Sequence, residues 1–100
     1  MNIYRISQKV NVGYDTFDSA IVIAINEQEA RKIHPASYIT HWKDYGWYGS
    51  LSDGEEYKNC DGNHNWVDAN QLDKVSVELL GVADSKYKES CAILSSYNRG

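Results

Sequence analysis

The sequence predicts an α+β domain, with a mostly antiparallel four-stranded sheet in the order β-β-α-β-β and one or two helices packed on one face. Three observations predict it. The run from Ala20 to Ile25 is continuous in small and β-branched residues, which is typical of a buried strand. A helix-capping pattern follows directly. Two apolar segments near the C-terminus, residues 74–82 and 90–98, indicate two further strands.

The first part of the chain predicts two strands joined by a connection of moderate length. Residues 2–10 alternate weakly, with Tyr4 and Ile6 on one parity, and indicate the first strand. Turn-forming residues then dominate residues 11–18. The run 20–25 lacks alternation, so we expect both of its faces to be covered. That predicts a central strand with a helix on one side.

The helix signal is local and specific. Asn26 is a good N-cap, and Glu29 lies three residues further on, which makes a capping-box pattern. Pro35 cannot continue a helix and restricts the residue before it. We therefore expect a short helix over residues 27–33. Asp68 is a second candidate cap, for a single turn.

Residues 36–66 form an aromatic-rich insertion between the helix and the third strand of a single domain, residues 1–100. Seven of the chain's twelve aromatic residues lie between Tyr38 and Trp66, and no period of 2 or 3.6 runs through them. A structureless loop of this length is unusual in a compact domain. We therefore expect some helix in residues 36–46 or a short strand in residues 47–51.

Composition excludes several classes of protein. The net charge of −4 disfavours non-specific electrostatic binding to nucleic acid and favours a basic protein partner. No apolar run is long enough to cross a bilayer, and the N-terminus lacks a signal-peptide core. We expect the protein in the cytoplasm. Its two cysteines make no disulfide framework, and Cys91, in an apolar run, is expected to be buried.

Motifs for catalysis and metal binding are weak. Cys60 and His64, with His34 and His41 upstream, match no common zinc spacing. Cys91 lies in a predicted strand, where a thiol is usually inert. Glycine-rich phosphate loops are absent from the sequence, and the acidic residues read as turn formers and solvated surface. The sequence therefore predicts no metal, no cofactor and no enzymatic activity.

The aromatic residues of the insertion are the candidate binding site: Trp42, Tyr45, Trp47, Tyr48 and Trp66. Such rings serve as anchors against a protein, line a ligand pocket, or stack on bases. Base stacking is disfavoured because few basic residues lie nearby. The other interpretation is a small core beneath the loop, and we expect two or three rings to be buried in that way. A protein-binding surface ranks first and a ligand pocket second.

Both ends of the chain resemble a group of small, uncharacterised proteins common in phages and prophages. Those proteins begin with a Tyr-x-Ile-Ser-Gln strand, continue through a Tyr-Asp-Thr-Tyr-Asp-Ser-Ala turn, and end a short helix at His-Pro. The matching residues here are Tyr4, Ile6, Ser7, Gln8, Tyr14, Asp15, Thr16, Asp18, Ser19, Ala20, His34 and Pro35, with Phe17 in place of the second Tyr. The C-terminal "SSYNRG" is similar to their closing Ser-Phe-Asn-Ala-Gly.

The resemblance implies a phage or prophage origin and supplies no catalytic residues. Small acidic phage proteins often inhibit bacterial enzymes or immune systems. We therefore expect a non-enzymatic binding protein, active in the host cytoplasm, that engages a host protein such as an antiviral defence effector through the aromatic surface. The alternative is a module that sequesters a small, nucleotide-like molecule. Pairing of sheet edges into a homodimer is a further option.

Overall fold

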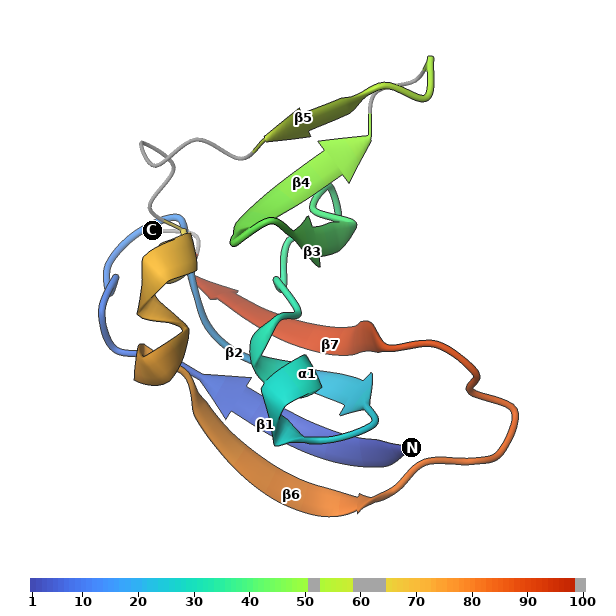
Figure 1. Ribbon diagram of the computed structural model, residues 1–100. Coiled ribbons are helices and arrows are strands. Elements are labelled where there is room, and N and C mark those ends of the chain that lie inside the picture. The colour runs from blue at the N-terminus through green and yellow to red at the C-terminus, as the bar shows by residue number, and fades with distance from the viewer. Residues whose placement is uncertain (51–52, 59–64, 99–100) are drawn as a thin grey trace.

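The chain folds around two antiparallel sheets (Figure 1), shown in a computed structural model that describes residues 1–50, 53–58 and 65–98. The larger sheet has the order β6-β1-β2-β7 and the smaller has the order β3-β4-β5. The strands are β1 (Asn2–Ser7), β2 (Thr16–Ala24), β3 (His41–Lys43), β4 (Gly46–Ser50), β5 (Glu56–Lys58), β6 (Ser76–Val82) and β7 (Cys91–Asn98). The helices are α1 (Glu27–Arg31) and the 3-10 helix η1 (Ala69–Lys74).

The β1-β2 pair forms the centre of the larger sheet. Its register is unbroken and places Tyr4 opposite Val22 and Ile6 opposite Ala20. Directly opposite residues share a face, and all four side chains are buried. The predicted antiparallel four-stranded sheet is confirmed, and β2 is a central strand, as the apolar run indicated.

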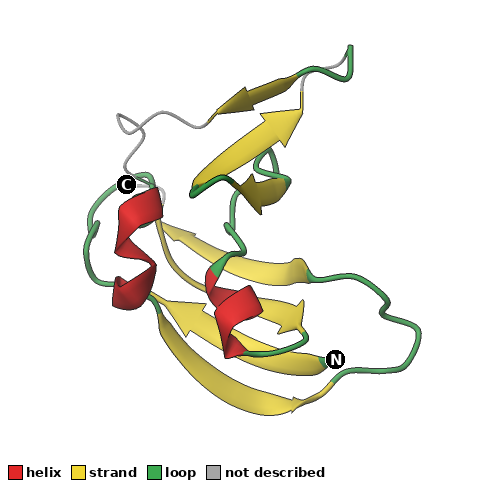
Figure 2. Ribbon diagram, in the orientation of Figure 1, coloured by secondary structure: helices red, strands yellow, loops and turns green. Residues whose placement is uncertain are grey.

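Helix α1 begins where the capping pattern predicts. The Asn26 side chain accepts a hydrogen bond of 2.9 Å from the backbone N–H of Glu29. The helix ends at Arg31, two residues earlier than expected, and the Arg31 guanidinium donates to the carbonyl oxygen of Val75 at 2.6 Å. Ala30 is fully buried in the same core as the β1-β2 pair, and α1 crosses in front of the larger sheet in Figure 2.

The last two strands are not neighbours, although short connections usually join antiparallel neighbours. Strands β6 and β7 lie at opposite edges of the larger sheet, because β1 and β2 occupy the positions between them. The connection over residues 83–90 therefore passes across the end of the sheet (Figure 1). Ala83 N–H donates to the carbonyl oxygen of Met1 at the start of that connection.

The insertion forms the smaller sheet. The expected strand over residues 47–51 is present as β4, whereas the helix considered for residues 36–46 is replaced by β3. The smaller sheet lies beyond the β7 edge of the larger sheet (Figure 1). It shares the main core, since Trp47 from β4 joins the same buried cluster as Val22 and Trp66.

None of the helices in the described ranges has the length and apolar character that crossing a membrane requires.

Candidate functional site

The five predicted aromatic residues do not form one surface. Trp47 and Trp66 are core residues, with exposed fractions of 3% and 1%. Trp42 and Tyr48 are half-buried, whereas Tyr45 is 88% exposed. Trp47 and Trp66, named as candidate binding residues, therefore lie in the core, as expected for two or three of the five rings. Neighbouring residues of a strand point to opposite faces, so β4 sends Trp47 into the core.

Trp47 and Trp66 enclose a buried histidine. The His34 ring lies 5.2 Å from the Trp47 ring and 6.3 Å from the Trp66 ring, measured between centroids. The backbone N–H of Ala36 donates to His34 Nδ1 at 3.0 Å, so Nδ1 is an acceptor and the ring is neutral. Burial lowers the pKa of His34 to about 4. His34, considered as a metal-site residue, is thus part of the core.

Tyr45 occupies the tip of a tight hairpin. Lys43 pairs with Gly46, which leaves Asp44 and Tyr45 as a two-residue loop. Their φ angles are +48° and +58°, as a type I′ turn requires. Asp tolerates this conformation, but a bulky aromatic residue there is an outlier that usually marks strain. The chain therefore holds a large ring out in solvent at a position that glycine would suit better.

A second feature is an open cleft of about 850 Å³. Residues 32–37 and 39–42, which run from the end of α1 into β3, line one part of the cleft. Residues 90–95, which are Ser90 and the first five residues of β7, line another part. Successive strand residues point to opposite faces, so a cleft touched by six in a row runs along the strand's edge. Cys91, expected to be buried, is half-buried here because β7 is an edge strand.

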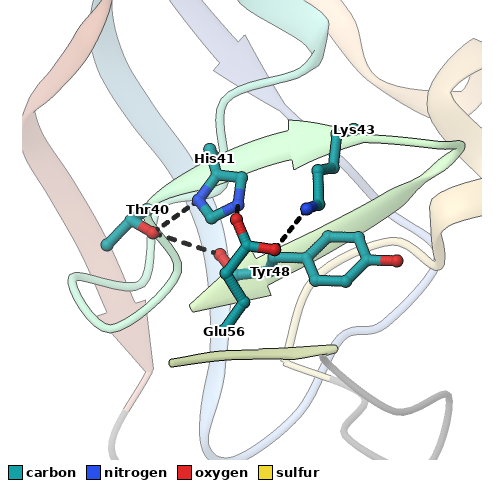
Figure 3. Close-up of polar contacts among 5 residues, drawn as sticks. All are labelled: Thr40, His41, Lys43, Tyr48 and Glu56. Atoms are coloured by element: carbon teal, nitrogen blue, oxygen red, sulfur yellow. Dashed lines mark hydrogen bonds and ion pairs between the residues drawn. The ribbon is translucent and has the colours of Figure 1, made fainter. Parts of the chain in front are cut away.

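Glu56 ties the three strands of the smaller sheet together (Figure 3). From β5 its carboxylate forms an ion pair with Lys43, and its Oε1 lies 2.9 Å from Nε2 of His41, both on β3. The hydrogen bond from Lys43 holds the pKa of Glu56 below its usual value, and the same bond raises the pKa of Lys43. The sequence predicts Glu56 only as solvated surface, because nothing in its local sequence indicates that it contacts residues of β3.

A hydroxyl, an imidazole and a carboxylate also line up in this region. Thr40 Oγ1 lies 2.8 Å from His41 Nδ1, on the opposite side of the ring from Glu56. The carboxylate of Glu56 can only accept, so Nε2 of His41 carries the proton between them, and Nδ1 of a neutral ring faces the Thr40 hydroxyl as an acceptor. The Thr40 hydroxyl also lies 3.4 Å from the carbonyl oxygen of Tyr48, a second acceptor for its proton. These contacts join the start of β3 to β4 and β5.

Comparison with known proteins leaves the family open. No protein-family model, curated protein or solved structure matches this chain. The resemblance to phage and prophage proteins therefore stays a prediction, and the proposals below depend on the geometry of the two surfaces.

Metal ligands do not converge in the described part of the chain. Within residues 1–50, 53–58 and 65–98, no three His, Cys, Asp or Glu side chains are grouped to hold an ion. Cys60 and His64, the candidate pair of the sequence, lie outside the described residues. His34 and His41 have separate partners, in the aromatic core and at Glu56.

Proposed function

We propose that this chain is a non-enzymatic, phage-encoded binding protein that engages a host protein, such as an antiviral defence effector, in the host cytoplasm. The observation that supports it is the hairpin tip, where Tyr45 is held in solvent in a strained backbone conformation. Strain of this kind costs of order 1–3 kcal/mol and is often associated with function. In this proposal a β-β-α-β-β scaffold, with α1 on one face, serves to display the insertion over residues 36–66.

The hairpin has the properties of a preorganised anchor. Tyr is among the residues that contribute most at protein interfaces, and a rigid loop loses little entropy when it binds. The two-residue turn fixes the backbone of Tyr45, and the Glu56 contacts with His41 and Lys43 hold the strands beneath it. The half-buried rings of the same hairpin lie on its two faces: Tyr48 stacks on His41, whereas Trp42 packs against Trp47 and the core. The net charge of −4 favours a partner with a basic face.

The test is a binding comparison with the host protein that the wild-type chain captures. Once identified, that protein is titrated calorimetrically against wild type, Tyr45→Ala and Trp42→Ala. A hot-spot anchor predicts a loss of about 2 kcal/mol, or roughly 30-fold in Kd, for Tyr45→Ala. Tyr14→Ala is the matched control, because Tyr14 is also a strongly exposed tyrosine, at 76%, but lies in another loop. Equal affinities for Tyr45→Ala and the control would contradict the proposal.

The second candidate function is the binding of a small molecule in the cleft, because the cleft's volume falls in the range of ligand pockets. The cleft offers little unpaired positive charge for a nucleotide's phosphates, which favours a protein as the partner. Lys32 on its wall lies 3.4 Å from Glu29, and His41 lies beside Glu56, so both basic side chains already have carboxylate partners. A thermal-shift screen with nucleotides separates the two functions, since a ligand that binds only the folded state raises Tm.

A further inference from the structure

We infer that the edge of β7 receives an extended segment of the partner protein as an added strand, with apolar side chains at every second position. The inference rests on the proposed function and names the kind of segment that the partner supplies. It concerns the cleft beside residues 90–95, whereas the proposed function depends on the Tyr45 hairpin.

Strand β7 lies at an edge of the larger sheet. In the described part of the chain β2 is its sole neighbour in the sheet. Apart from the pairing with β2, no backbone hydrogen bond joins residues 90–95 to another segment of the described chain. An edge strand presents a row of N–H and C=O groups, and an added strand satisfies them. The cleft runs along this row, so the edge is accessible to one extended chain.

The β7 edge lacks two of the usual protections of an edge strand. Natural edge strands carry charges or proline, which discourage pairing. The segment Cys91–Asn98 contains neither, and it exposes Ile93 and Leu94, the latter at 67%. The two edges do not differ in regularity, since β7 shifts register twice against β2 and β6 shifts once against β1. They differ in charge, because the opposite edge strand β6 carries Glu78. An edge that is long, uncharged and apolar is typical of a pairing surface.

The surroundings of the β7 edge define the side chains of the partner segment. Residues of an added strand point alternately to the two sides of the sheet. On one side they meet the cleft wall, where Ile33, Ile39 and Trp42 provide apolar surface. On the other side they lie beside the exposed Leu94. The β7 lining carries no charge, and the charged residues Lys32 and Glu29 elsewhere in the cleft pair with each other, so the central residues of the segment are uncharged. The acidic chain favours basic residues at the flanks of the segment.

One extended segment fits this place better than a second copy of the chain. A second copy would bring a whole sheet to the edge. The opposite wall of the cleft, residues 32–37 and 39–42, faces that edge, and the smaller sheet lies beyond it (Figure 1). A single strand needs only the spacing of about 4.8 Å to its neighbour.

The experiment uses a random-peptide display library as the probe. Peptides are selected on the full wild-type chain, and the enriched peptide is synthesised and titrated against three variants. Leu94→Lys places a charge on the β7 edge, and Ile93→Pro removes an N–H at the register irregularity, where proline is tolerated. Leu79→Lys is the matched control, at 60% exposure on the opposite edge.

The expected result is an enriched peptide with alternating apolar residues. Its affinity falls at least about tenfold in Leu94→Lys and Ile93→Pro and is unchanged in Leu79→Lys. Amide hydrogen exchange of the wild-type chain provides a readout that needs no variant, with new protection expected at residues 90–95 on binding. Failure to enrich such a peptide, or protection elsewhere, overturns the inference. A nucleotide that raises Tm where no peptide binds, or a wild-type dimer that Leu94→Lys dissociates, also overturns it.

The same set of variants separates this inference from the proposed function. If the host protein loses affinity for Tyr45→Ala and keeps it for Leu94→Lys, the hairpin function stands and strand addition at β7 is rejected. If the host protein keeps its affinity for Tyr45→Ala and loses it for Leu94→Lys, the hairpin proposal is rejected and strand addition stands.

Discussion

The indole nitrogen of Trp47 donates a 3.0 Å hydrogen bond to the backbone carbonyl oxygen of Lys32. Lys32 is the C-cap of α1, where carbonyl groups have no partner within the helix. Trp47 lies on β4, in the middle strand of the smaller sheet. One side chain therefore joins the insertion to the end of the helix, in addition to filling the core between them.

Trp47→Phe should destabilise the protein by about 1–3 kcal/mol, since the mutation leaves the Lys32 carbonyl without this donor in a partly buried place. Urea denaturation gives the free energy of unfolding. Trp42→Phe is the control, because Trp42 is on the adjacent strand and only half-buried. Equal losses for the two variants would mean that the hydrogen bond contributes nothing beyond ring volume.

Gly49→Ala should also destabilise the protein, through overpacking. A Cβ at Gly49 would lie 2.5 Å from the carbonyl oxygen of Tyr38 and 2.5 Å from the Tyr57 ring, and the backbone atom cannot move aside cheaply. Overpacking of this kind costs about 1–3 kcal/mol. Gly81→Ala is the matched strand control, since a Cβ there meets nothing within 4 Å. Thermal unfolding of the two variants should show a clearly lower Tm for Gly49→Ala alone.

Tyr45→Gly should raise stability while it weakens binding. Glycine adopts positive φ at no steric cost, whereas a side chain in that region costs about 1–2 kcal/mol. We expect the free energy of unfolding to rise by about 1 kcal/mol and the affinity for the host protein to fall. Denaturation and calorimetry on the same preparation check both. A variant that is more stable and binds as well as wild type would show that the ring has no role in binding.

Stability should fall between pH 6.5 and about 4 because of His34. Its pKa is lower in the folded protein than in the unfolded chain, so the unfolded chain takes up a proton first as the pH falls. The contribution is complete above pH 6.5 and is lost toward pH 4, by up to about 3 kcal/mol. Denaturation of wild type and His34→Gln across this range measures it. The free energy of unfolding of His34→Gln should depend less steeply on pH than that of wild type. Parallel curves for the two proteins would show that another group takes up the proton.

The strands of the larger sheet and the start of α1 could be predicted because each depends on residues that are close in the sequence. The hydrogen bond from the Glu29 N–H to the Asn26 side chain spans only three residues, and the β-branched run of β2 favours a strand by its composition. The hairpin between β3 and β4 could not be predicted from the sequence, because its turn lacks the usual residues. Its turn residues are Asp44 and Tyr45, and the usual signal is Asp or Asn followed by Gly.

The candidate site was predictable as a region and unpredictable in detail. That residues 41–48 carry an unusual density of rings is plain from the sequence. Which rings face solvent depends on the register and facing of β4, since a shift of one residue would exchange Trp47 and Tyr48. The cleft could not be foreseen at all, because it brings residues 32–42 beside residues 90–95.

By itself the sequence determined the four strands of the larger sheet, the capped start of α1 and the acidic, aromatic character of the chain, because each depends on composition or on residues within a few positions. The tertiary structure decided which strand lies at an edge, which tryptophans are buried and what Glu56 contacts. These depend on pairings between distant segments. Strands β6 and β7 are near in the chain, yet the β1-β2 pair separates them and leaves β7 beside the cleft.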